Sequence, residues 1–145
     1  MLFERRNGQH LLTTDPARIA LDDVEMFLRQ TYWAAGRSRE RIARTLERSL
    51  CFAILDERTG RTVAFARVVT DYADFAWLCD IFVEPSSRGA GLGVWLVESV
   101  LEHPGLQGLR RFILATSDAH GLYERFGFTP LAQPQLWMER GPNPR

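Results

Sequence analysis

The segment from Val83 to Gly93 constrains this chain more than any other, because it takes a strand through a glycine-rich turn directly into a helix. Gly89, Gly91 and Gly93 can adopt positive φ and allow a ligand to approach the backbone closely. The unpaired amides and the positive dipole at the start of a helix attract anionic oxygens. A pyrophosphate suits such a loop, although an ordinary strand-to-helix turn explains the same residues.

The surrounding pattern argues against two common phosphate-binding folds. The loop lacks the Gly-Lys-Ser/Thr ending of a nucleotide P-loop. It also follows an antiparallel meander rather than opening a parallel dinucleotide-binding unit. The meander is predicted from the strands LCFAILD and TVAFARVVT, joined by Glu57–Gly60, and from a second tight connection around Asp71–Asp74 that leads into FAWLCDIFV.

The remaining segments predict a mixed α/β chain. An amphipathic helix over ALDDVEMFLRQTYW is expected to end at Gly36, and a second helix is expected to be capped by Ser38. Further helices are predicted over residues 91–102 and 118–126, and HLLTT, RRFILAT, FTPL and QLWME are predicted strands, the last two closing the sheet.

Composition suits one compact domain spanning residues 1–145, because 46% of the residues are apolar and 11% aromatic. The 18 basic and 18 acidic residues balance without a block of like charge, so no nucleic-acid partner is expected. No segment approaches the roughly 20 apolar residues of a membrane span, and a cytoplasmic protein is expected. Cys51 and Cys79 lie in apolar runs as reduced core thiols, and no metal-ligand spacing is present.

Two ordered motifs resemble the GNAT superfamily of acetyl-CoA-dependent N-acetyltransferases. Its acyl-CoA signature, Gln/Arg-x-x-Gly-x-Gly/Ala, is matched by Arg88, Gly91 and Gly93. About one strand later, LATSDAHGLYERFGF ends in the family's Tyr-x-x-x-Gly-Phe, which begins at Tyr123. The resemblance is strongest from Trp77 to Pro130. It implies the GNAT fold, an α/β (α+β) architecture with a mixed, mostly antiparallel twisted sheet, splayed central strands and about four flanking helices.

The resemblance also implies acetyl-CoA as the acetyl donor, with its pantetheine arm on the strand before the loop and its pyrophosphate on the loop amides. The Arg88 side chain is expected either to add charge to a phosphate or to be solvated. Asp118 stands where family members often carry Asn against the pantetheine, or is only the helix N-cap. The expected cofactor-binding residues are Ile81, Phe82, Val83, Arg88, Gly89, Ala90, Gly91, Leu92, Gly93, Asp118 and Tyr123.

Tyr123 corresponds to the family tyrosine that gives a proton to the departing CoA thiolate. A phenol with a reference pKa of about 10 is protonated at neutral pH and can supply that proton. The alternative is a tyrosine that only packs. His120 lies one turn earlier and is expected to be exposed or structural.

Asp80 is a carboxylate within the apolar run from Phe75 to Val83, and Arg67 is its counterpart on the preceding strand. A hairpin centred between Tyr72 and Ala73, or one residue later, places the two on one face. They are then expected to form a buried ion pair, or Asp80 acts catalytically by anchoring or deprotonating the amine. The expected substrate-binding residues are Trp33, Arg37, Arg67, Trp77 and Asp80, with core packing as the alternative for the tryptophans.

Together these features predict a bacterial-type N-acetyltransferase that moves acetyl from acetyl-CoA to the primary amine of a small molecule by direct attack in a ternary complex. The alternatives are a non-catalytic acyl-CoA-binding module and a transferase for a longer acyl group or a protein N-terminus. The sequence does not decide whether the chain forms a homodimer.

Overall fold

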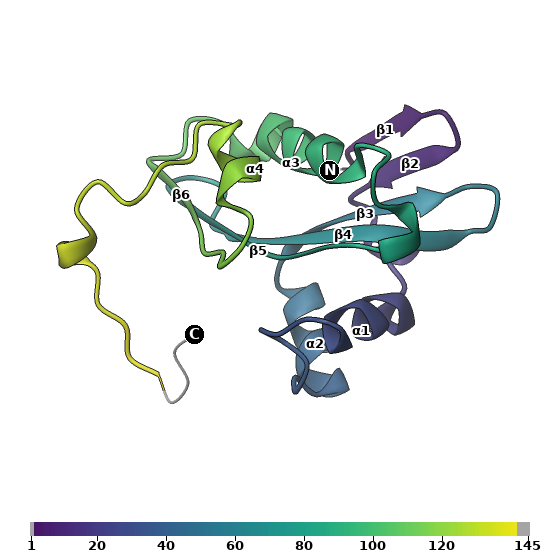
Figure 1. Cartoon of the computed structure of the whole chain (residues 1–145), viewed down its shortest axis with the longest axis horizontal. Helices are drawn as coiled ribbons and strands as arrows, with labels where there is room; N and C mark the ends of the chain where they lie inside the picture. Colours follow the sequence, from purple (N-terminus) through teal and green to yellow (C-terminus); the bar gives the residue numbers. More distant parts are fainter. Residues whose placement is uncertain (1, 142–145) are drawn as a thin grey trace. The chain divides into compact units, whose positions relative to one another are not determined.

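The computed structural model describes residues 2–141, and the chain forms two compact units, one ending at Leu114 and the other beginning at Ala115. The first unit holds a six-stranded sheet whose spatial order follows the sequence (Figure 1). Its strands are β1 (Glu4–Asn7), β2 (His10–Thr13), β3 (Leu50–Asp56), β4 (Arg61–Thr70), β5 (Phe75–Val83) and β6 (Arg111–Leu114). All pairs are antiparallel except β5 with β6, which is parallel.

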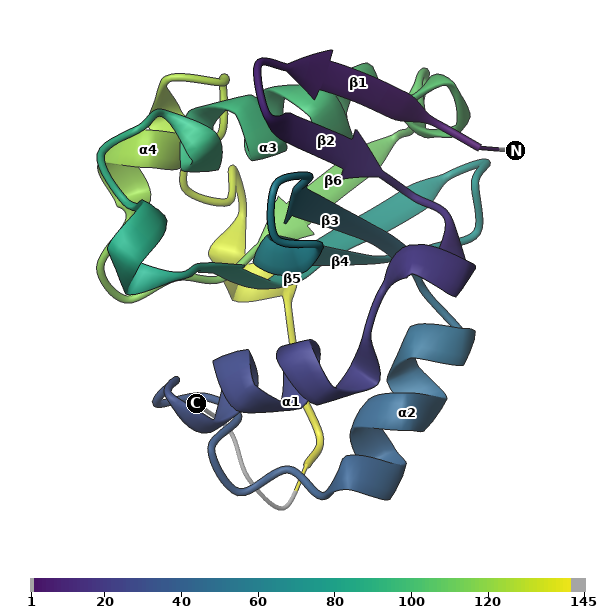
Figure 2. The ribbon, with the colours of Figure 1, turned by 90° about the vertical axis from the view of Figure 1, so that its right-hand side faces the viewer.

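Helices cover both faces of this sheet, which explains why its central strands are apolar almost throughout. The helices α1 (Leu21–Arg29) and α2 (Arg39–Glu47) lie on one face and α3 (Leu92–Glu102) on the other (Figure 2). The α1–α2 face includes a buried cluster in which Phe27 stacks on Phe82, with ring centroids 4.9 Å apart. The mixed, mostly antiparallel architecture predicted from the sequence is thereby confirmed.

Polar side chains set the ends of α1 and α2. Ser38 caps α2 as predicted, since its hydroxyl accepts from the Arg41 amide at 3.2 Å. The first helix ends earlier than predicted, at Arg29 rather than after Trp33. The cause is Thr31, whose hydroxyl donates to the Leu28 carbonyl at 2.7 Å and accepts from the Ala34 amide at 3.1 Å. These bonds replace a further helical turn with the tight turns that carry the chain to α2.

The register of the β4–β5 hairpin differs from the prediction by one residue. Arg67 is opposite Cys79, so an unbroken ladder would have turned Asp80 to the other face. A β-bulge intervenes, in which Asp80 and Ile81 together oppose Ala66 and Asp80 adopts φ +52°. The bulge returns the Asp80 side chain to the face that carries Arg67.

The parallel pairing of β5 with β6 covers only the first part of β5. It runs from Phe75 opposite Arg111 to Leu78 opposite Leu114, whereas β5 itself continues to Val83. Among residues 2–141, no other strand pairs with that side of residues 79–83. The family resemblance implied splayed central strands, and the structure shows that β5 continues for five residues beyond its pairing with β6.

The second unit contains α4 (His120–Glu124) and the chain beyond it. One of the two interpretations of Asp118, the N-cap of α4, is wrong, because Ala119 is the N-cap residue of this helix. The Ala119 amide donates to the Thr116 hydroxyl at 3.1 Å. The predicted closing strands FTPL and QLWME are also wrong, since no strand follows β6 within residues 115–141 and a 3-10 turn covers Pro134–Leu136. Proline lacks the N–H that a strand ladder needs, and Pro130 and Pro134 both interrupt this stretch.

Asp71 is expected to stabilise the hairpin that sets the β4–β5 register. Its carboxylate accepts from the amides of Ala73, Asp74 and Phe75 at 2.8 to 3.0 Å, and these bonds lower its pKa to about 2. The folded pKa is below the unfolded value of about 3.9, so the contribution is present above pH 4 and is lost as the pH falls toward 2. Asp71→Ala should therefore lower the melting temperature more at pH 7 than at pH 2.

Asp71→Asn is the matched control, because the amide oxygen still accepts while the charge is gone. It should keep more of the melting temperature at pH 7 than Asp71→Ala and lose the wild-type pH dependence between 4 and 2. Equal melting temperatures for wild type and Asp71→Ala at pH 7 would show that the turn does not depend on this carboxylate.

Candidate active site

The loop between β5 and α3 leaves the start of a helix open. A 3-10 turn at Pro85–Ser87 is followed by Gly89 with φ +89° and by Gly91 with φ +76°, which is the N-cap residue of α3. No side chain caps α3, and no acidic residue lies in its first turn. The first amides of α3 therefore have no side-chain cap, which is the condition under which a helix start can bind an anion.

Arg88 lies back on the end of β5 in this structure. Its Nε donates to the Val83 carbonyl at 3.0 Å, and its guanidinium carbon is 5.7 Å from the centre of the Phe82 ring. The residue is nevertheless exposed. The loop amides, rather than this side chain, are therefore the part of the motif that already has an anion-binding geometry.

The unpaired edge of β5 leads directly into this loop. Ile81, Phe82 and Val83 form its last residues, and Phe82 is buried while its two neighbours are half-buried. An extended ligand can hydrogen-bond to free main-chain groups of such an edge as a further strand does. The first unit therefore provides a continuous polar track of strand edge and helix start.

Asp80 is the centre of a buried polar cluster. Its Oδ2 accepts from Arg67 Nε at 2.8 Å and from Arg37 Nη1 at 2.7 Å. Its Oδ1 accepts from Trp33 Nε1 at 3.1 Å and from Arg37 Nη2 at 3.3 Å. The predicted Arg67–Asp80 ion pair is confirmed. Trp33 and Arg37, which were predicted as substrate-binding residues, also donate hydrogen bonds to the Asp80 carboxylate.

The two arginines keep Asp80 ionised despite its burial. The carboxylate is 2% exposed, and burial alone would raise its pKa. Hydrogen bonds from Arg37 and the charges of both guanidiniums outweigh that effect and leave the pKa of Asp80 below its usual value. With both oxygens engaged and a lowered pKa, this carboxylate is poorly suited to remove a proton from an amine.

Trp77, predicted to bind the acceptor substrate, and the two cysteines lie on strands β5 and β3 of the same sheet. Trp77 is half-buried between Val69 and Ile113 on the neighbouring strands and makes no hydrogen bond to Asp80. Cys51 and Cys79 are buried and take part in no disulfide within residues 2–141, as predicted. Burial raises the pKa of Cys51 to about 12, so this thiol is a core group rather than a nucleophile.

In the second unit, Tyr123 is 8% exposed and its ring packs edge-on against Phe128, with centroids 6.1 Å apart. Burial, with a smaller contribution from the Asp118 carboxylate, raises the pKa of Tyr123 to about 12. The phenol is therefore a proton donor throughout the physiological range. Asp118 and His120 are both exposed, the latter as predicted.

With this geometry described, the comparison with known proteins can be interpreted. The model of the acetyltransferase (GNAT) family matches residues 18–128, which include the loop, the Asp80 cluster residues and Tyr123. The chain belongs to the GNAT acetyltransferase family. The match extends across both compact units, and the organisation of residues 1–145 as one domain stays a prediction.

Three known proteins resemble this chain over 63% to 91% of its length. A Xanthomonas campestris protein described as a "putative acetyltransferase" of the GNAT family is 48% identical in sequence to this chain. Its crystal structure superposes with a TM-score of 0.87, and the match covers 91% of this chain and 92% of the Xanthomonas chain. A Gibberella zeae protein named "Putative acetyltransferase" is 30% identical over 80% of this chain and 76% of its own length. Serotonin N-acetyltransferase 2 of Oryza sativa subsp. japonica is 35% identical over 63% of this chain and 48% of its own length.

One residue in contact with the Asp80 cluster was not predicted from the sequence. Ser49 precedes β3, and its hydroxyl accepts from Arg67 Nη1 at 3.1 Å. No sequence signal marked it, because a single serine beside an apolar strand is common. In residues 2–141, no helix is long and apolar enough to cross a membrane, and His, Cys, Asp and Glu side chains nowhere gather in a group of three suited to a metal ion.

Removing the charge of Asp80 should destabilise the protein. Asp80→Asn leaves the guanidiniums of Arg67 and Arg37, which are 9% and 18% exposed, without a negatively charged partner. Breaking a buried ion pair in this way costs about 3–5 kcal/mol of unfolding free energy. The free energy of unfolding in urea at pH 7 measures the loss. Because the folded pKa is lowered, the difference from wild type should shrink as the pH falls below about 4.

Asp74→Asn is the matched control, since it removes an aspartate from an ion pair with Arg110 that is 52% and 69% exposed. Its effect should be far smaller. Unfolding free energies that are the same for Asp80→Asn and wild type, together with lost turnover, would point instead to a direct role for Asp80 at the acceptor.

Proposed function

We propose that this GNAT protein transfers the acetyl group of acetyl-CoA to the primary amine of a small molecule, by direct attack in a ternary complex. The observation that carries the proposal is the uncapped start of α3, which follows two positive-φ glycines and adjoins the unpaired edge of β5. This arrangement supports binding of a ligand with a pyrophosphate at one end and an amide-containing arm at the other.

In the proposed complex the amides from Gly89 to Gly93 hold the pyrophosphate, and Arg88 swings from Val83 to a phosphate or stays in solvent. The main chain of Ile81, Phe82 and Val83 binds the pantetheine arm. Asp118 accepts from a pantetheine amide but cannot donate to its carbonyl as an asparagine can.

In the chemical step, the neutral amine attacks the thioester carbonyl carbon, the C–S bond breaks, and Tyr123 donates its phenolic proton to the departing sulfur. The proton lost by the amine passes to solvent, and the Tyr123 phenolate regains a proton from solvent, so that the products are the amide and the CoA thiol. Holding the amine and thioester together accounts for much of the rate enhancement, because the reaction becomes effectively unimolecular. Tyr123 suits the donor role because its raised pKa keeps it protonated.

Asp80 acts in this scheme through the groups that it holds. Its four hydrogen bonds orient Trp33, Arg37 and Arg67, which are the proposed acceptor-side residues together with Trp77. A thiol-release assay with acetyl-CoA and panels of amino acids, polyamines, aryl amines, aminoglycosides and peptides tests the function. Binding of acetyl-CoA without turnover on every panel would identify a non-catalytic binding module instead.

Gly91→Glu is expected to block cofactor binding, because a carboxylate at the start of α3 opposes the pyrophosphate and occupies its place. The dissociation constant for acetyl-CoA, measured by calorimetry, should rise at least tenfold, or about 1.4 kcal/mol. Gly108→Glu is the control, since Gly108 has nearly the same φ, +72° against +76°, and neither position has an atom within 4 Å of an added Cβ. Unchanged affinity in Gly91→Glu would remove the loop from the cofactor site.

Tyr123→Phe is expected to separate binding from chemistry. The ring packing stays, so acetyl-CoA affinity and melting temperature should be close to wild type, whereas kcat should fall by about 10²–10⁴-fold. Because the pKa of Tyr123 is raised to about 12, wild-type kcat should show no alkaline decline from this group below about pH 11. Wild-type turnover in Tyr123→Phe at every pH where chemistry limits the rate would mean that water is the donor.

A further inference from the structure

The Asp80 cluster contains more positive than negative charge. Arg37 and Arg67 contribute two cations, and Asp80 is the one carboxylate that forms an ion pair with either of them among residues 2–141. The cluster therefore carries a net charge of about +1 where its side chains are only 2% to 18% exposed. An unbalanced charge in such surroundings is costly unless an anion or water compensates it.

Both guanidiniums retain unused donors. Each has five N–H groups. Arg37 directs its two Nη atoms to Asp80, and Arg67 uses Nε on Asp80 and Nη1 on Ser49. Arg37 Nε and Arg67 Nη2 have no acceptor within residues 2–141. Planar guanidiniums with free N–H groups bind carboxylates and phosphates well, because several charge-assisted hydrogen bonds form at once.

The cluster adjoins a cavity through Ser49 and the unpaired β5 edge through Asp80, whereas Arg37 and Arg67 do not themselves line that cavity. Ser49, which accepts from Arg67, also lines a cavity of about 420 Å³ whose walls include Leu46, Cys51 and Tyr72. That volume suits a small molecule. Asp80 itself lies at the bulge where the β5 edge, the proposed site of the pantetheine arm, becomes unpaired.

We infer that the acceptor is an amine that also carries an oxyanion, a carboxylate or a phosphate, and that Arg37 and Arg67 bind this oxyanion. The inference rests on the proposed function and specifies its substrate class. Asp80 aligns the two guanidiniums and prevents them from repelling each other, while their remaining N–H groups bind the substrate. A polycationic amine is disfavoured, because its second ammonium would meet two guanidiniums and a carboxylate that is already fully engaged.

The test uses pairs of amines in which one member carries an oxyanion and the other carries an aminomethyl group, a hydrogen or a hydroxyl in its place. We would compare 4-aminobutyrate with putrescine, phenylalanine with phenethylamine, and glucosamine 6-phosphate with glucosamine, with acetyl-CoA saturating. The oxyanion member of at least one pair should have a kcat/KM at least tenfold higher. The first two pairs report on carboxylate recognition and the third on phosphate recognition. A preference for putrescine and the other members without an oxyanion would overturn the inference while leaving the proposed function intact.

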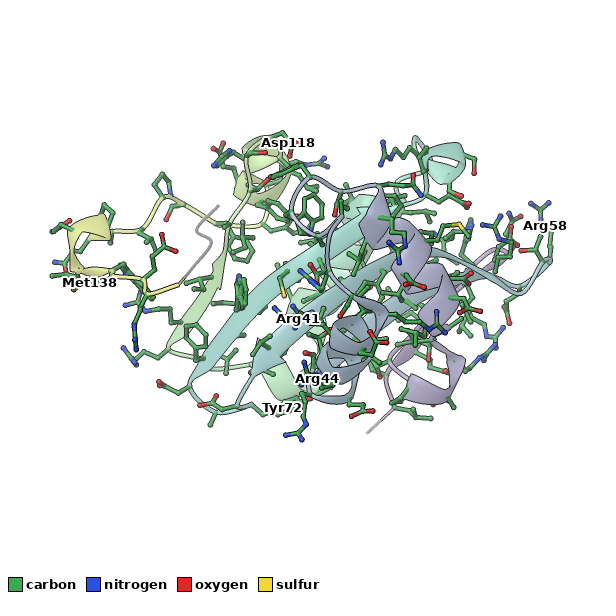
Figure 3. The ribbon with its side chains drawn as sticks, turned by 90° about the horizontal axis from the view of Figure 1, so that it is seen from below. Arg41, Arg44, Arg58, Tyr72, Asp118 and Met138 are labelled. Carbon is green, nitrogen blue, oxygen red and sulfur yellow. The ribbon has the colours of Figure 1, made fainter. Side chains whose placement is uncertain are left out.

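Arg37→Gln should lower kcat/KM for the preferred oxyanion substrate at least tenfold more than it lowers kcat/KM for the member of the same pair that lacks the oxyanion. Arg44→Gln is the control, because Arg44 is exposed on α2 and forms no ion pair within residues 2–141 (Figure 3). An equal loss for both members of the pair, or an equal loss in Arg44→Gln, would contradict oxyanion recognition by Arg37.

A binding measurement keeps the two ideas distinguishable if no amine is turned over. With CoA bound, 4-aminobutyrate or glucosamine 6-phosphate should raise the melting temperature of wild type more than that of Arg37→Gln. That result without turnover would refute acetyl transfer but support the oxyanion site. An enzyme that binds CoA yet shows neither binding nor turnover with any oxyanion member would refute the site.

Discussion

The carboxylate of Asp80 is the interaction on which the arrangement of the first unit depends. It joins β5 to Arg67 on β4 and to Trp33 and Arg37 in the connection between α1 and α2. A buried carboxylate is tolerated only when its oxygens are satisfied, so all of these donors must be in place together. That requirement holds an otherwise irregular connection against one face of the sheet.

The bulge at Asp80 has consequences on both sides of β5. Toward β4, it turns the carboxylate to the face that carries Arg67. On the opposite side, pairing with β6 stops just before the bulge, at Leu78, and the strand edge beyond it is unpaired. One local irregularity thus separates a fully paired half of β5, which anchors the strand, from a half whose main chain is available to a ligand.

The two charged features of the first unit use different physics to favour anions. The start of α3 does so with main-chain amides and a helix dipole, in an exposed loop made of glycines. The Asp80 cluster does so with two partly buried guanidiniums whose charge one carboxylate only half offsets. The two proposed substrates match these two features. The pyrophosphate of the CoA thioester would bind at the start of α3, and the oxyanion of the acceptor amine would bind at the two guanidiniums.

The sequence by itself determined the elements whose signals are local. The glycine loop, α3, the apolar strands β3 to β5 and the Ser38 cap were predicted because loop flexibility, apolar runs and capping act over a few neighbouring residues. The strand HLLTT was predicted and corresponds to β2, whereas β1 was missed although Gly8, with φ +60°, is a local turn signal between the two strands.

Only the tertiary structure decided the contacts between distant segments. The pairing of Arg67 with Asp80 was predicted from parity, yet the actual register has the other parity and the contact forms through a bulge. The roles of Trp33, Arg37 and Ser49 depend on bringing a connection and a strand end to one carboxylate. Such contacts are set by packing and by the need to satisfy buried charge, neither of which is encoded in the spacing of neighbouring residues.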